Sequence, residues 1–124
     1  MDELKNKKIL LVDDEKELLK TTEEVLRSEG FFNIYTAASC EVALQIVKTQ
    51  PIALLLLDVM LPDGDGFSLF EKLRQITQAP VIFLTAVADK EHIAAVLGLN
   101  PAGYFLKPLE REKVLEKVAQ VLQE

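Results

Sequence analysis

Acidic and basic residues that end short apolar runs are the chemically informative residues of this sequence. Asp13 and Asp14 follow one such run, Asp58 ends a second and Lys107 ends a third. If the runs are neighbouring parallel strands, their carboxyl ends meet at one edge of a sheet, where open sheets of this kind bind ligands. Three carboxylates at one edge repel one another unless a divalent cation or an ammonium group lies among them. The sequence therefore predicts an acidic, cation-binding pocket that contains a lysine.

The residue types in this pocket suit magnesium binding and phosphoryl chemistry. Mg²⁺ prefers oxygen ligands and is usually held by one or two carboxylates together with phosphate oxygens. Asp14 and Asp58, with Asp13 beside them, could supply the carboxylates, and the backbone carbonyl of Met60 could add a ligand. A carboxylate can also attack a phosphoryl group to give an aspartyl phosphate, and we expect Asp58 to be this nucleophile. The cation and Lys107 would neutralise the charge on the transferred oxygens.

Thr85 and the Lys107-Pro108 pair complete the predicted pocket. Thr85 follows the fourth apolar run, where its hydroxyl could donate to a phosphoryl oxygen. A cis peptide bond is possible at Lys107-Pro108, because X-Pro bonds have only a small preference for trans. The acidic residues also have an ordinary structural interpretation, because Asp is common in helix caps and turns.

The segments that must position these residues alternate between two patterns. Five short apolar runs are typical of strands buried on both faces: 9–12, 34–37, 53–57, 81–84 and 104–106. Five longer segments have apolar residues at helical spacing: 15–29, 39–48, 68–76, 90–97 and 110–122. The alternation predicts an α/β fold with a parallel, helix-covered sheet and right-handed crossovers. Ser39 is expected to cap the second helix, and Gly30 to end the first.

Length and composition indicate one small domain. The chain of 124 residues is 49% hydrophobic and 27% charged, so we expect residues 1–124 to form a single domain with no effector domain. The net charge of -6 argues against direct binding of nucleic acid and against docking on anionic membranes. No apolar stretch could span a bilayer. The single Cys40 cannot form an internal disulfide, and we expect a cytoplasmic protein.

These motifs together are similar to those of the receiver domain of bacterial response regulators. The matching residues are Asp13-Asp14, Asp58, Leu61-Pro62-Asp63-Gly64-Asp65-Gly66, Thr85-Ala86 and Lys107-Pro108. The resemblance covers almost the whole chain and implies a flavodoxin-like (βα)5 three-layer sandwich with a five-stranded parallel sheet of order 2-1-3-4-5. One departure is Asn100-Pro101-Ala102-Gly103, where many receivers have a Gly-Ala-Asp-Asp-like turn. Asn tolerates the left-handed backbone conformation that Gly would otherwise supply.

The same resemblance implies a role in two-component or phosphorelay signalling. In that family a histidine kinase or a histidine phosphotransfer protein donates a phosphoryl group to the residue matching Asp58, with Mg²⁺, or Mn²⁺ in its place. The domain catalyses only its own phosphorylation and dephosphorylation, so we expect neither a conventional enzyme nor an organic cofactor. Residues matching Thr85 and Tyr104 form the switch. The output surface would comprise helix 90–97, strand 104–106 and helix 110–122, where an effector or a second copy would bind, with Leu106 facing outward.

Two other functional classes use similar residues. A magnesium-dependent hydrolase of the haloacid dehalogenase type also forms an aspartyl phosphate. It needs a second acid two residues after its nucleophile, where this chain has Met60. A flavodoxin-like cofactor carrier would need a loop rich in Ser, Thr and Gly after the first strand, where Asp13-Asp14-Glu15 presents negative charge instead. A degenerate receiver that only binds a partner is a third alternative, although all the phosphorylation residues are present.

Overall fold

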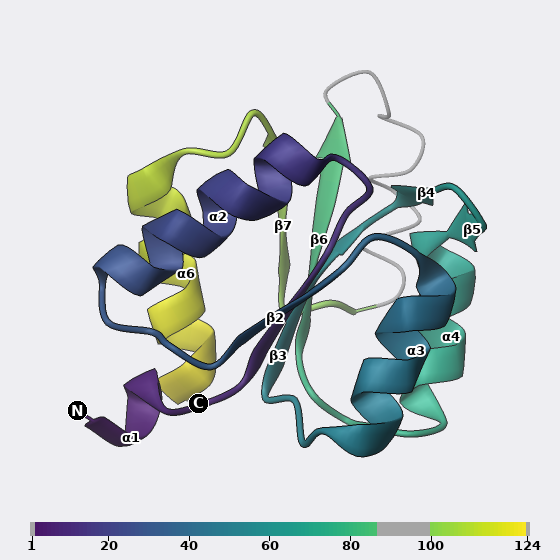
Figure 1. The fold of residues 1–124 in the computed structure, drawn as a ribbon, viewed down its shortest axis with the longest axis horizontal. Coiled ribbons are helices and arrows are strands. Elements are labelled where there is room, and N and C mark those ends of the chain that lie inside the picture. Colours follow the sequence, from purple (N-terminus) through teal and green to yellow (C-terminus); the bar gives the residue numbers. More distant parts are fainter. Residues whose placement is uncertain (1, 87–99, 124) are drawn as a thin grey trace.

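Five parallel strands form the central sheet in a computed structural model of the chain that describes residues 2–86 and 100–123 (Figure 1). In spatial order the strands are β2 (Ile34–Ala37), β1 (Ile9–Val12), β3 (Leu54–Asp58), β6 (Val81–Ala86) and β7 (Gly103–Lys107). Counted along this sheet, the order is 2-1-3-4-5, which confirms the flavodoxin-like prediction. Each neighbouring pair is parallel, so the carboxyl ends of all the strands lie along one edge.

Helices cover both faces of the sheet and give the molecule three layers. On one face lie α2 (Lys16–Ser28) and α6 (Arg111–Gln123), and on the other lie α3 (Cys40–Thr49) and α4 (Gly66–Arg74) (Figure 1). The helix predicted at 90–97 lies outside the described residues. In the part of the chain that the structure describes, no helix has the length and apolar character needed to cross a membrane.

The central strands are continuously apolar up to their carboxyl ends because each face of the sheet has its own core. In β3, Leu55 and Leu57 belong to the core under α3 and α4, whereas Leu54 and Leu56 belong to the core under α2 and α6. All four side chains are fully buried. A strand with one solvated face would alternate apolar and polar residues instead. Two cores therefore explain the continuous leucine run of the sequence.

Local signals set several helix ends where the sequence predicts them. Ser39 Oγ accepts a hydrogen bond from the Val42 N–H at 3.3 Å and so caps α3. Gly30 follows α2 with φ of 97°, a conformation that glycine adopts at little steric cost. Asn100 has φ of 56°, in agreement with its expected left-handed conformation. For α2, α3, α4 and α6, the predicted helix ends differ from the observed ones by one or two residues.

Three short elements have no counterpart in the sequence prediction. They are α1 (Asp2–Lys5), β4 (Met60–Leu61) and β5 (Gly64–Asp65). The two strands pair with each other as an antiparallel hairpin directly after β3, so they position the loop beside Asp58. Elements of two to four residues are too short for a periodic hydrophobic pattern, which is why the sequence does not reveal them.

Candidate functional site

The carboxyl edge of the sheet brings the predicted acidic residues and the predicted lysine together. Asp13 directly follows β1, Asp58 ends β3 and Lys107 ends β7. Lys107 Nζ lies 2.9 Å from Asp13 Oδ2 and 3.1 Å from Asp58 Oδ2. Carboxylate oxygens of Asp13, Asp14 and Asp58 lie within 4.8 Å of one another, and we call these three residues the acidic cluster.

The carboxylate of Asp58 is held in one orientation by two hydrogen bonds. Its Oδ1 atom accepts from the Met60 N–H at 3.1 Å, and its Oδ2 atom accepts from Lys107 Nζ at 3.1 Å. Asp58 itself is almost fully buried, whereas Met60, at the start of β4, is 56% exposed. A rigid carboxylate at the sheet edge is well oriented for attack on an electrophile, because less conformational freedom has to be lost in the reaction.

Asp13 has one buried oxygen that is not hydrogen bonded. Its Oδ1 atom accepts from the Glu15 N–H at 2.9 Å, but its Oδ2 atom accepts no hydrogen bond from a described residue, although it is ion paired with Lys107. Burial raises the pKa of Asp13 to about 6, the Asp58 charge adds to this rise, and the Glu15 N–H and Lys107 oppose it. The charged form of Asp13 is therefore only partly compensated by its surroundings.

The acidic cluster fits a divalent cation. Within the acidic cluster, Asp13 and Asp58 are ion paired with Lys107, and the buried Asp13 Oδ2 atom lacks a hydrogen-bond donor, so an additional positive charge would be stabilised there. Asp14 is exposed and opens the cluster to solvent. Hard oxygen donors that leave room for water are the usual environment of Mg²⁺.

Lys107 remains charged in this environment. Burial by itself would lower the pKa of the Lys107 ammonium, but Glu15, Asp13 and Asp58 outweigh this effect and hold the pKa above its ordinary value. The Lys107-Pro108 peptide bond is cis, one of the two forms that the sequence allows. The ammonium group is therefore a permanent cation at the rim of the acidic cluster.

Glu15 is a site residue that the sequence reasoning missed. Its Oε1 atom accepts a hydrogen bond from Lys107 Nζ at 2.9 Å, although the two residues are far apart in the chain. The Glu15 side chain is 61% exposed, compared with 1% for Asp13. Glutamate at the start of a helix is common, so nothing in the local sequence distinguishes it.

Asp63 and Gly66 shape the loop that follows Asp58. The Asp63 carboxylate accepts hydrogen bonds from the N–H groups of Cys40 and Glu41 at 2.8 and 3.1 Å, which lowers the Asp63 pKa. A Cβ atom on Gly66 would lie 2.5 Å from the backbone oxygen of Asp58. Only glycine therefore lets the start of α4 pack directly against the end of β3. These contacts give a structural reason for Asp63 and Gly66 in the motif at 61–66.

Thr85 and Tyr104, the predicted switch residues, lie on neighbouring strands. Thr85 is fully buried in β6, and among the described residues its hydroxyl donates one long hydrogen bond, of 3.4 Å, to the Ala86 carbonyl. Tyr104 and Leu106 in β7 are 39% and 42% exposed, so Leu106 does face outward as predicted. The structure thus places the Tyr104 ring outside the core.

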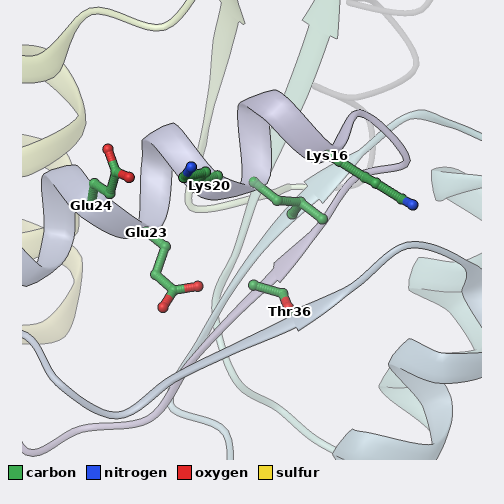
Figure 2. Close-up of a pocket in the computed structure, with 6 residues that line it drawn as sticks. Lys16, Lys20, Glu23, Glu24 and Thr36 are labelled. Carbon is green, nitrogen blue, oxygen red and sulfur yellow. The ribbon is translucent and has the colours of Figure 1, made fainter.

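A groove between α2 and β2 is separate from the acidic cluster (Figure 2). It has a volume of about 450 Å³ and is lined by Lys16, Leu19, Lys20, Glu23, Glu24 and Thr36. Lysine and glutamate side chains of opposite charge border it, as expected for a solvated surface. None of the predicted site residues lines this groove, so concavity alone does not identify the chemical site.

Comparison with known proteins identifies the same family throughout. The family pattern described as the response regulator receiver domain matches residues 9–119. The chain is 39% identical over 115 residues to the transcriptional regulatory protein CpxR of Escherichia coli (strain K12), covering 93% of this chain and 49% of CpxR. It is 36% identical over 105 residues to the transcriptional regulatory protein YvrH of Bacillus subtilis (strain 168), covering 85% and 44%. The chain spans about half the length of the curated relatives it matches.

Solved structures agree with these sequence matches. A CheY-like response regulator receiver domain protein from Methanospirillum hungatei JF-1 superposes with a TM-score of 0.87 and 30% identity, covering 95% of this chain and 94% of that one. A two-component response regulator from Clostridium difficile gives a TM-score of 0.89 at 29% identity, covering 96% and 98%. The hydrolase and flavodoxin-like alternatives are not favoured by these matches. The strand order, the acidic cluster at the sheet edge and these matches lead to one assignment. The chain belongs to the family of response regulator receiver domains of two-component systems.

Proposed function

We propose that this receiver domain takes a phosphoryl group onto Asp58 in the presence of Mg²⁺. The observation that carries the proposal is the arrangement of three carboxylates and the Lys107 ammonium at one sheet edge, contributed by segments far apart in the chain. As a receiver domain, the chain is a signalling module and not a conventional enzyme. Catalysis by the chain would be limited to its own phosphorylation and dephosphorylation.

The proposed reaction is an in-line phosphoryl transfer between a phosphohistidine and Asp58. A carboxylate oxygen of Asp58 attacks the phosphorus, the P–N bond breaks, and its electron pair leaves with the imidazole, which takes up a proton. Lys107, 3.1 Å from Asp58 Oδ2, would neutralise charge on the transferred oxygens. The Thr85 hydroxyl would donate to one of them.

The acidic cluster would hold the cation that this reaction requires. Asp13, Asp14 and Asp58 would provide carboxylate ligands, and the backbone carbonyl of Met60 would add another. When bound, Mg²⁺ would offset the repulsion between these carboxylates and the phosphoryl oxygens. Mn²⁺, which also prefers oxygen ligands, is expected to replace it.

Partners are proposed from the family and from the exposed face of β7. The phosphoryl donor would be a histidine kinase or a histidine phosphotransfer protein. Thr85 and Tyr104 would act as the switch, and an effector or a second copy would bind a face that comprises β7, α6 and the helix predicted at 90–97. Exposed Tyr104 and Leu106 line a hollow of about 320 Å³ on this face. We propose that residues 1–124 act as one receiver domain in the cytoplasm, without direct contact to nucleic acid or membrane.

Acetyl phosphate tests the proposal without the native kinase. Incubation with Mg²⁺ should add the mass of one phosphoryl group to the intact protein, and chelation of Mg²⁺ should prevent it. The Asp58→Asn variant should take up no phosphoryl group. Asp65→Asn is the matched control, because Asp65 Oδ1 caps α4 by accepting from the Ser68 N–H, which an Asn oxygen can also do. Labelling of Asp58→Asn at the wild-type rate would contradict the proposal.

A further inference from the structure

Glu15 is the exposed member of the set of carboxylates around Lys107. We propose that Glu15 is a positioning residue: it accepts a hydrogen bond from the Lys107 ammonium group, so that Asp13 Oδ2, although ion paired with Lys107, accepts no hydrogen bond and can bind a divalent cation. The inference deepens the proposed function and rests on it, because the cation in question is the one that phosphorylation of Asp58 would require.

The hydrogen bonds of Lys107 are directed selectively among three carboxylates. The Nζ atom is 2.9 Å from Asp13 Oδ2, 2.9 Å from Glu15 Oε1 and 3.1 Å from Asp58 Oδ2. It donates hydrogen bonds to Glu15 and Asp58. Asp13 Oδ2 is buried and accepts none from any residue in the described part of the chain. The ammonium group thus has Glu15 and Asp58 as hydrogen-bond acceptors, whereas the equally close Asp13 oxygen is its partner in an ion pair.

The Glu15 side chain is available for this role because it does not cap its own helix. Glu15 is the N-cap residue of α2, but its side chain makes no capping hydrogen bond. Its backbone N–H donates to Asp13 Oδ1 at 2.9 Å. Glu15 thus donates to the first oxygen of Asp13 and accepts a hydrogen bond from the lysine that is ion paired with the second. The second oxygen is left without a donor, which is costly for a buried carboxylate and favourable for a cation ligand.

Removal of the Glu15 carboxylate should let the lysine compete with the cation. The Nζ donor now directed at Glu15 would turn toward Asp13 Oδ2, which already lies 2.9 Å away. An ammonium hydrogen bonded to that oxygen must be displaced before a metal ion can bind it. Loss of Glu15 should therefore weaken Mg²⁺ binding by more than the loss of one nearby negative charge explains.

Calorimetric titration of the unphosphorylated protein with MgCl2 alone measures this effect. Glu15→Gln should raise the Kd for Mg²⁺ roughly three- to tenfold, in the range typical of coupled neighbouring residues. Glu17→Gln is the matched control, because it removes the same charge from the first turn of α2 at an exposed position. It should change the Kd by less than about twofold. Glu15→Asp, which keeps the charge but shortens the side chain, should weaken binding more than Glu17→Gln.

The Lys107→Met background tests whether Glu15 acts through the lysine. With Lys107 replaced, Glu15→Gln should weaken Mg²⁺ binding no more than Glu17→Gln does. An undiminished effect in that background would overturn the inference, as would equal effects of the two glutamine variants in the wild-type background. If the wild-type protein bound no Mg²⁺ at all, the metal part of the proposed function would fail together with the inference. If the wild-type protein bound Mg²⁺ and Glu15→Gln left the Kd unchanged, the inference would fail but the proposed function would not.

Discussion

At the scale of single residues, the acidic cluster lowers the stability of the fold but gathers the carboxylates that could bind a cation. Asp13 and Asp58 are almost completely buried, and the single ammonium of Lys107 is shared between them and Glu15. Replacing Asp13 by its neutral isostere is expected to stabilise the fold, because an incompletely paired buried charge is expensive and Lys107 keeps Glu15 and Asp58 as partners. Retention of both carboxylates is consistent with a requirement for a cation at this position.

Asp13→Asn should therefore stabilise the fold at neutral pH. The folded-state pKa of Asp13 is about 6, above the usual 3.8, so the folded state binds this proton more tightly than the unfolded state does. The stabilisation from the protonated form is fully present below about pH 4 and is lost as the pH rises through 6. In urea unfolding at pH 7 with a chelator present, the variant should gain about 1–3 kcal/mol over the wild type.

The pH dependence provides the control for this prediction. The stability difference between wild type and Asp13→Asn should shrink toward pH 4, where the wild-type carboxyl is protonated. Added Mg²⁺ should stabilise the wild type more than the variant, because ligand binding to the folded state adds to its stability. A stability difference that stays constant from pH 4 to pH 7 would show that the charge of Asp13 is not its cause.

At the scale of elements, contacts on both sides of the β4–β5 hairpin fix the loop after Asp58. The hairpin places Asp63 at the amino terminus of α3, where its carboxylate binds two backbone N–H groups. Asp65 then caps α4, and the Gly66 N–H donates to the Val59 carbonyl at 2.9 Å. The end of β3 is thus tied to two helices within eight residues of Asp58. We infer that the orientation of Asp58 depends on these tertiary contacts as well as on its own strand.

Gly66→Ala should disturb the site and the fold together. The added Cβ would meet backbone atoms of Asp58 and Val59 at 2.5 and 2.9 Å, and these atoms cannot move without shifting β3. We expect a loss of about 2 kcal/mol or more in the free energy of unfolding and slower phosphorylation by acetyl phosphate. Gly103→Ala is the control, because there the Cβ would meet only the flexible end of Lys117. Equal losses in the two variants would mean that close packing at Gly66 is not the cause.

At the scale of the whole molecule, strand β7 connects the acidic cluster to the surface. Lys107 at its end enters the site, whereas Tyr104 and Leu106 are exposed and Phe105 packs into the core under α2 and α6. The helix that follows is anchored at both ends, since Arg111 donates to Ser28 Oγ at 2.8 Å and Lys7 Nζ donates to the Leu122 carbonyl at 2.9 Å. A change at the acidic cluster can therefore reach the face of β7 through one strand.

Tyr104→Ala should separate phosphorylation from its structural consequence. Tyr104 is outside the acidic cluster, so the variant should be labelled by acetyl phosphate within about twofold of the wild-type rate. The shifts of backbone amide resonances in β7 and α6 on phosphorylation should be smaller, because no ring remains to move inward toward Thr85. Phe32→Ala, at another exposed aromatic residue, should leave both measurements unchanged. Loss of labelling and of the shifts to the same degree would argue against a switch role for Tyr104.

Much of the architecture follows from the sequence because it depends on local pattern. Strands buried on both faces require continuous apolar runs, and the run at 53–57 predicts β3 to within one residue at each end. Ser39 and Gly30 marked helix ends through their own backbone and side-chain chemistry. Placing Asp13, Asp58 and Lys107 at one edge needed only the rule that the carboxyl ends of parallel strands coincide.

The fold class, the family and the residue types gathered at the sheet edge can therefore be inferred from the amino-acid sequence. The way the Lys107 ammonium is shared, its hydrogen bond to Glu15 and the contact of Asp63 with the start of α3 become visible only in three dimensions. These features join residues far apart in the chain, and they depend on distances and directions that no local pattern encodes. A hydrogen bond forms or fails within a few tenths of an ångström, and that precision is set by how the two cores pack.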